Sequence, residues 1–89
     1  MIIQELAIEL AKYKIRVNGI APGWTDKDQE GKLFYEKYSL LRQSSVDPCY
    51  IGRAAVYLAA DYYSKFTTGT VLKIDGGTSL YNNRVDETY

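Results

Sequence analysis

The chain has 89 residues, of which 46% are apolar and 25% charged, and its eleven Lys and Arg residues balance its eleven Asp and Glu residues. This length and composition predict a soluble globular segment of at most one domain, and the even charge excludes the basic footprint of proteins that bind nucleic acid or anionic membranes. The absence of histidine excludes Ser-His-Asp and Cys-His nucleophile systems and zinc sites that use imidazole.

The cysteine count and the N-terminal sequence bear on location. A single cysteine cannot form an internal disulfide, and the sequence opens on a helical pattern instead of a basic segment followed by an apolar core. No apolar run reaches the roughly 18 residues that a membrane span requires. We therefore expect a cytoplasmic protein with no membrane partner.

The first predicted elements are a helix and a strand. Apolar residues recur at helical spacing over 2–13, which predicts an amphipathic helix that starts without a capping residue. The next run, 15–21, is rich in β-branched residues and ends at the turn signal Pro22-Gly23. This pattern predicts a buried strand.

A polar stretch over 24–46 predicts a mobile lid that carries a short helix. Asp47-Pro48 then predicts the start of a second helix, because Asp caps free amide groups and Pro at the first helical position loses no hydrogen bond. The spacing of the following apolar residues predicts one buried helix face, made of Ile51, Ala54, Ala55, Leu58, Ala59 and Tyr62.

The last predicted strand covers 70–74, and Asp75-Gly76-Gly77 ends it before a polar tail over 78–89. A strand that returns through a helix to another strand is the right-handed parallel crossover of α/β folds. Parallel sheets normally have several strands and two covered faces, so two strands alone indicate that other strands are missing.

Four groups of residues, taken in order and at their separations, resemble the final third of the short-chain dehydrogenase/reductase (SDR) family. They are Glu9-Leu10-Ala11 through Ile15-Arg16-Val17-Asn18, then Ala21-Pro22-Gly23, then Asp47-Pro48 with Ala55-Val56-Tyr57-Leu58-Ala59, and finally Thr68-Gly69 with Asp75-Gly76-Gly77.

The resemblance implies that residues 1–89 form one segment, the C-terminal third of a Rossmann-like doubly wound parallel sheet. It also implies an NAD(P)-dependent oxidoreductase that interconverts an alcohol and a ketone or aldehyde, with NAD or NADP as cofactor. In the family the nicotinamide lies beside the Pro-Gly corner, so the cofactor-binding residues carried over are Pro22, Gly23, Trp24 and Thr25. The same corner could instead be a simple strand-ending turn.

The chain departs from the family pattern in three respects. None of its nine tyrosines begins the family's Tyr-x-x-x-Lys motif, and no two of its seven glycines have the Gly-x-Gly spacing of the phosphate loop. Lys27 stands where the family often has a threonine, which leaves Thr25 or no residue for that role. No catalytic residue can therefore be assigned, and we expect the chain alone to be inactive.

Two partners fit an incomplete enzyme: the N-terminal SDR portion, or identical subunits in a homo-oligomer. The alternative is a non-catalytic remnant, an interaction or oligomerisation module that associates through its uncovered sheet edge and helices. Both hypotheses require a partner.

Other candidate residues have structural explanations. Asn18 is expected to form a structural bridge more readily than to act in catalysis, and Cys49 is expected to be an inert thiol because no histidine can activate it. Asp26, Asp28 and Glu30 resemble the start of a calcium loop, but Lys37 occupies the position of its essential glutamate, so no metal site is predicted.

The aromatic residues leave two alternatives open. Tyr50, Tyr57, Tyr62 and Tyr63 are expected to pack against a partner or the sheet, with a substrate pocket as the lesser possibility. In the lid, closure over a substrate and a flexible connector are equally compatible with Phe34, Tyr35 and Tyr38.

Overall fold

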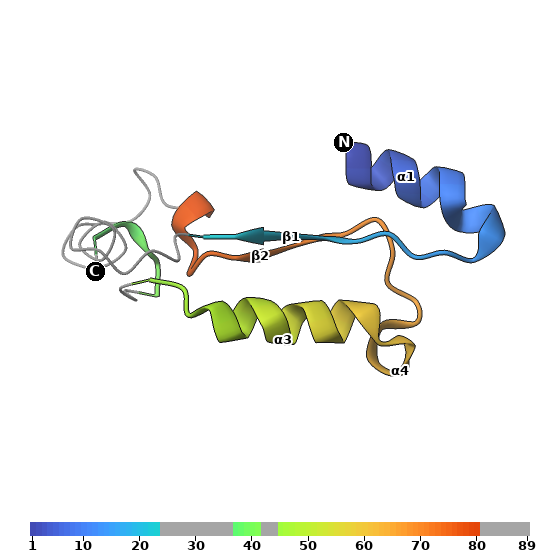
Figure 1. The fold of residues 1–89 in the computed structure, drawn as a ribbon. Coiled ribbons are helices and arrows are strands. Elements are labelled where there is room, and N and C mark those ends of the chain that lie inside the picture. The colour runs from blue at the N-terminus through green and yellow to red at the C-terminus, as the bar shows by residue number, and fades with distance from the viewer. Residues whose placement is uncertain (24–36, 42–44, 81–89) are drawn as a thin grey trace.

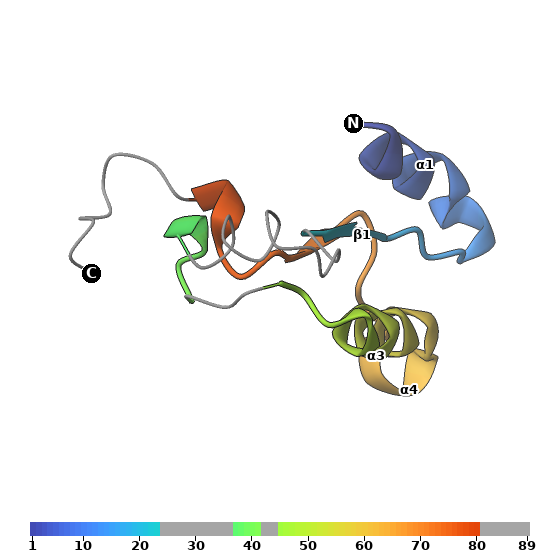
Figure 2. The same ribbon diagram turned by 60° about the vertical axis from the view of Figure 1, so that its left-hand side comes forward.

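The computed structural model describes residues 1–23, 37–41 and 45–80, and it places helices on both faces of a small parallel sheet (Figure 1). Strand β1 (Gly19–Pro22) pairs in parallel with β2 (Val71–Ile74). Helix α1 (Ile2–Leu10) lies on one side of the strands and α3 (Pro48–Ala59) on the other, as both views show (Figure 2). The predicted α/β order and the parallel arrangement of the two strands are confirmed.

The first strand is shorter than the predicted 15–21. The regular ladder begins at Gly19. Opposite the residues before Gly19, the segment that leads into β2 turns through Gly69, whose φ is 75°. Side chains add to the backbone bond from the Gly69 amide to the Val17 carbonyl (2.7 Å) there: Thr68 Oγ1 accepts from the Val17 amide at 3.1 Å, and Asn18 Oδ1 accepts from the Thr70 amide at 3.2 Å. The segments before β1 and β2 therefore stay side by side, although they no longer form regular strands.

The first helix is confirmed, but its last predicted turn is not α-helical. Residues Ala11–Tyr13 form a 3-10 turn, which ends at Lys14 in the left-handed conformation with φ 58°. The helix contacts the strands where side chains are small: a Cβ built on Gly19 would lie 3.3 Å from Ile3 Cγ1, and one built on Gly69 would lie 3.5 Å from the Cβ of buried Ala7. Gly19 therefore allows α1 to approach the sheet closely, whereas a Cβ on Gly69 would make an ordinary contact and the positive φ is what favours glycine there.

Helix α3 begins as predicted. The Asp47 carboxylate accepts a hydrogen bond of 2.9 Å from the Cys49 amide, and Pro48 occupies the first helical position. Its C-terminus differs from the prediction of a face that continues to Tyr62. Ala60 is extended (φ −85°, ψ 114°), and a separate short helix, α4 (Asp61–Ser64), follows at a new angle and leaves Tyr62 89% exposed.

Arg16 explains why α3 can stop at Ala60. Its guanidinium donates to the carbonyls of Leu58 (2.8 Å) and Ala59 (3.3 Å), which the break deprives of helical partners. The buried Ser64 hydroxyl accepts from Arg16 at 3.1 Å and lies 2.7 Å from the Tyr57 carbonyl. A charged side chain from the strand segment thus caps the end of the crossover helix.

Little apolar surface is buried. Among the described residues, the buried apolar side chains are those of Ala7, Val46 and Leu58. Two members of the predicted buried face, Ala55 and Ala59, are exposed, and Phe66 is 95% exposed. The prediction of a buried face therefore holds fully at Leu58 only, because within residues 1–23, 37–41 and 45–80 no further element covers the rest of that helix surface.

None of the helices in the described part of the chain is both long enough and apolar enough to cross a bilayer.

Replacing Arg16 with alanine should lower the free energy of unfolding by about 2–4 kcal/mol, since the carbonyls of Leu58 and Ala59 lose a charged donor and the contact to Leu58 is part-buried. Asp61→Asn is the matched control. The Asp61 side chain is 77% exposed, so loss of its 2.9 Å ion pair with Arg16 should cost less than about 1 kcal/mol. Urea unfolding followed by circular dichroism measures both, and equal losses would contradict the capping role.

Candidate functional site

The carboxyl ends of the two strands form the edge at which the cofactor site was predicted. β1 ends at exposed Pro22, and the Gly23 amide donates to the Ile74 carbonyl at 2.8 Å, one step beyond the regular ladder. Pro22 and Gly23 therefore lie where open α/β sheets bind ligands. Trp24 and Thr25 lie outside the described residues, so cofactor binding by these four residues stays a prediction.

The register fixes which backbone groups each side of β1 presents. The Gly19 and Gly23 amides both donate toward β2, and in a parallel ladder alternate residues direct their amide and carbonyl groups to opposite sides. Ile20 and Pro22 therefore direct theirs away from β2. Pro22 has no amide hydrogen, so on that side of the carboxyl edge it can accept but not donate a hydrogen bond.

Asp75-Gly76-Gly77 forms a tight turn directly after β2. The Asp75 carboxylate accepts from the amides of Gly77 (2.9 Å) and Ser79 (3.2 Å), and the 3-10 helix η2 (Thr78–Leu80) follows. Gly76 and Gly77 have φ of 63° and 86°, a region that favours glycine. This supports the structural interpretation of the motif.

Hydrogen bonding controls the charge of Asp75. Partial burial raises the pKa of the carboxyl group, but hydrogen bonds from the Ser79 side chain and from the Gly77 and Ser79 amides, with the charge of Lys73, outweigh burial and leave the pKa below its ordinary value of 3.8. The turn is therefore held by a carboxylate in the neutral pH range.

A groove of about 710 Å³ opens beside this turn. Its apolar walls come from Leu41, Val46, Tyr50 and Ile74, and Asp47, Lys73 and Asp75 add charged groups. The groove lies at the carboxyl end of β2, on the ligand-binding edge of the sheet. Tyr50 is thus the member of the tyrosine group that lines a groove at this edge, whereas Tyr62 and Tyr63 contact each other edge to face at 4.9 Å on α4.

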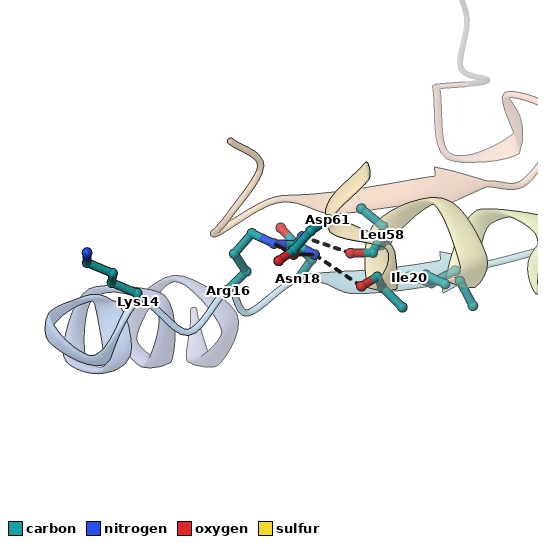
Figure 3. A pocket seen from close by; sticks show the side chains of 8 residues that line it. Lys14, Arg16, Asn18, Ile20, Leu58 and Asp61 are labelled. Carbon is teal, nitrogen blue, oxygen red and sulfur yellow. Dashed lines mark hydrogen bonds and ion pairs between the residues drawn. The ribbon is translucent and has the colours of Figure 1, made fainter. Parts of the chain in front are cut away.

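A second hollow, of about 400 Å³, lies between β1 and α3 (Figure 3). Arg16, Asn18 and Ile20 line it from the strand side, and Ala55 and Ala59 line it from the helix. In the figure Lys14 points away from the other labelled side chains, and Arg16 reaches the helix end. Because the Arg16 nitrogens all donate to protein oxygens, the hollow presents no free guanidinium for an anion.

The structural interpretation of Asn18 is supported. Its side-chain amide donates to the Thr67 carbonyl at 2.9 Å and accepts from the Thr70 amide at 3.2 Å, so both ends bridge to the segment that leads into β2. Residues of the motif Ile15-Arg16-Val17-Asn18 thus connect the strand segment to its neighbours.

Cys49 is exposed in the first turn of α3. Desolvation, with a hydrogen bond to Asp47 and the charge of that carboxylate, raises the pKa of the thiol above its ordinary value of 9.0, although Arg53 acts in the opposite direction. A raised pKa lowers the thiolate fraction at neutral pH, which fits an inert thiol.

Metal binding has no support in the part of the chain that the structure describes, where no three His, Cys, Asp or Glu side chains gather. The calcium-loop residues Asp26, Asp28 and Glu30 lie outside it, as do Phe34 and Tyr35 of the lid. Tyr38 is half-buried, and the Lys37 ammonium lies 5.4 Å from its ring centre.

Sequence reasoning missed Arg16, Ser64 and Ser39 as organising residues. The first had a usable signal, because a charged residue within a strand-like apolar run needs buried partners. The two serines had none, since their burial depends on contacts with distant parts of the chain.

Asp75→Asn should flatten the acid dependence of stability. Because folding lowers the pKa of Asp75, its carboxylate stabilises the fold above the ordinary pKa of 3.8, and this contribution is lost as the pH falls through the lower folded value. The urea midpoint of the variant should fall less than that of the parent chain between about pH 5 and pH 2. Ser79→Ala, which removes one donor to the carboxylate, should lie between them, and parallel curves for all three would contradict the role of Asp75.

Comparison with known proteins agrees with this geometry. Residues 1–79 match the family described as Enoyl-(Acyl carrier protein) reductase. The chain is 36% identical over 88 residues to 3beta-hydroxysteroid dehydrogenase 1 of Eggerthella lenta, covering 91% of the chain and 33% of that protein. It is 43% identical over 79 residues to 3-oxoacyl-[acyl-carrier-protein] reductase of Bos taurus, covering 84% of the chain and 31% of that protein.

D-arabinitol 2-dehydrogenase [ribulose-forming] of Candida tropicalis is 34% identical over 83 residues, covering 83% of the chain and 29% of that protein. The chain thus spans about a third of the length of the relatives it matches. The family match and the parallel strands bounded by Pro22-Gly23 and Asp75-Gly76-Gly77 lead to one conclusion: the chain belongs to the short-chain dehydrogenase/reductase family of oxidoreductases.

Proposed function

We propose that this chain forms one wall of the nicotinamide site of an NAD(P)-dependent oxidoreductase that interconverts an alcohol and a ketone or aldehyde, and that further SDR polypeptide completes the enzyme. The observation that carries the proposal is the hollow beside β1. Its apolar part is formed by Ala55 and Ala59, which the periodicity of α3 assigns to a buried face, with Leu58 and with Ile20 of the strand. The rest of the lining is polar and consists of Lys14, Arg16, Asn18 and Asp61. Small apolar side chains that line a hollow on the inner face of a helix fit a further element of the sheet.

The backbone of β1 supports the same proposal. Ile20 directs its amide and carbonyl away from β2, on the side where a neighbouring strand would pair. A strand edge in a parallel sheet is normally paired or covered. A strand placed there would pair with β1 and bring apolar side chains over the hollow.

Pro22 and Gly23 would allow a nicotinamide ring to approach the backbone at the carboxyl edge of the sheet. Gly23 has no side chain to occupy the carboxyl edge, and its amide is already bound to Ile74. The Pro22 carbonyl is then the acceptor that this corner directs away from β2. A bound nicotinamide cofactor supplies the hydride, while protein groups orient it and handle the proton.

The chain alone should not turn over. No Tyr-x-x-x-Lys motif is present for proton transfer, and no Gly-rich loop is present for the pyrophosphate. Pro22, Gly23, Trp24 and Thr25 remain the proposed cofactor-side residues. The relatives' names refer to a hydroxysteroid, an oxoacyl group and a sugar alcohol, which supports hydroxyl or carbonyl chemistry without selecting a substrate.

A second candidate function is a non-catalytic interaction module. The exposure of large apolar side chains on one end of the molecule favours it: Phe66 is 95% exposed, and Tyr62 and Tyr63 lie on the neighbouring α4. A surface of this kind is typical of a protein interface. This candidate predicts stable self-association without nucleotide binding.

Complementation tests the two candidates. The chain is mixed with the part of the bovine 3-oxoacyl reductase that precedes its matched region, and quenching of NADH and NADPH fluorescence is measured with reductase activity. We expect both signals in the mixture and neither in the separate polypeptides. Self-association of the chain, with no nucleotide signal in any mixture, would reject the oxidoreductase proposal.

Two arginine variants provide a matched control. Ala59→Arg places a charge in the hollow and should abolish complementation, because a strand beside β1 would bury that charge. Val56→Arg places the same charge on an exposed position of α3 and should leave complementation within about twofold of the parent chain.

A further inference from the structure

The turn after β2 holds two segments that are far apart in the sequence. The carbonyl of Gly76 accepts a hydrogen bond of 2.8 Å from the Ser39 hydroxyl and one of 3.1 Å from the Leu41 amide. Ser39 is fully buried, with 0% exposure. Residues 37–41 are therefore fixed to the turn by a side-chain and a backbone contact to one oxygen.

The same stretch also holds the end of β1. The Gly23 amide donates to the Ile74 carbonyl at 2.8 Å, two positions before Gly76. Gly23, directly after β1, and Ser39 are therefore both hydrogen-bonded to this stretch, Gly23 to the Ile74 carbonyl and Ser39 to the Gly76 carbonyl. Figure 1 shows this convergence, with 37–41 in green beside the orange-red residues that follow β2.

The turn is built to present that carbonyl. Gly76 and Gly77 adopt positive φ, and the Asp75 carboxylate fixes the amides of Gly77 and Ser79. A Cβ on Gly77 would lie 2.7 Å from the Cβ of Leu40, so residue 77 must be glycine for the segment to pack this closely. Backbone conformation, capping and packing all favour the same contact.

We propose that Ser39 and the Asp75-Gly76-Gly77 turn form a clamp that fixes residues 37–41 relative to Gly23, and that Ser39 is a positioning residue for the dinucleotide site. The second half of this inference rests on the proposed function. Ser39 does not touch a ligand; it acts by holding Leu41, which lines the groove at the carboxyl edge. The groove and the Gly23 corner would then keep a constant separation.

Hydrogen exchange tests the clamp in the full chain. Ser39→Ala should speed exchange of the Leu41 amide by about fivefold relative to the Gly19 amide, which donates to the Thr70 carbonyl at the other end of the sheet. Ser64→Ala is the control, because Ser64 is also a buried serine but caps α3. It should not speed exchange of the Leu41 amide relative to that of the Gly19 amide. Equal acceleration of both amides in Ser39→Ala, or no acceleration, overturns the clamp.

Ser39→Cys guards against a variant that fails to fold. It keeps nearly the same volume with a weaker donor, so the Leu41 amide should exchange at a rate between those of the parent chain and Ser39→Ala. A rate equal to that of the parent would show that the hydrogen bond to Gly76 does not hold the segment.

Nucleotide affinity tests the positioning role. In the complemented assembly, Ser39→Ala should raise the Kd for NADH or NADPH by about fivefold, and Ser64→Ala should change it less. An unchanged Kd together with faster Leu41 exchange would overturn the positioning role and keep the clamp. If the parent assembly binds neither nucleotide, the proposed function fails with the positioning role, while hydrogen exchange still decides the clamp.

Discussion

The parallel pairing of β1 with β2 is the constraint on which the rest of the structure depends. Parallel strands cannot be joined by a tight turn, so α3 must cross from one end of the sheet to the other. The crossover creates two demands: its helix has to stop at the amino ends of the strands, and the chain has to enter it from the carboxyl ends. Arg16 meets the first through Leu58 and Ala59, and the Gly76 carbonyl meets the second by holding the segment that leads toward α3.

The two ends of the sheet have different kinds of chemistry. At the amino end, polar side chains form hydrogen bonds within the protein: Asn18 bonds to Thr67 and Thr70, and Arg16 donates to carbonyl oxygens at the end of α3. At the carboxyl end, Ser39 and Asp75 bond to a turn built on glycines, and a groove opens beside that turn. This arrangement agrees with the general rule that open α/β sheets bind ligands at the carboxyl ends of their strands.

Local signals in the sequence were sufficient for the boundaries that depend on caps and turns, and the parallel direction followed from the strand-helix-strand order. Asp47-Pro48 set the start of α3 because a cap acts within one turn, and Pro22-Gly23 set the end of β1 because proline and glycine restrict their own backbone. The helix break at Ala60 was not predictable from periodicity, since Arg16, which caps the helix end, lies 42 residues from Leu58. The same holds at the carboxyl edge, where Ser39 and Gly76 are 37 residues apart. The residues proposed to face the cofactor could be named only by resemblance, because local backbone rules alone interpret a Pro-Gly corner as a simple strand-ending turn.

Attachment of Gly23 and Ser39 to nearly the same point on the sheet has a consequence for evolution. When both ends of a connecting stretch are fixed by contacts outside it, its length stops mattering to the sheet, and doubling a flexible connection costs only about 0.6 kcal/mol. Insertions and deletions between these two anchor points could therefore accumulate among relatives while the strand pair stays unchanged. The strand pair would keep its stability while the sequence between Gly23 and Ser39 changes.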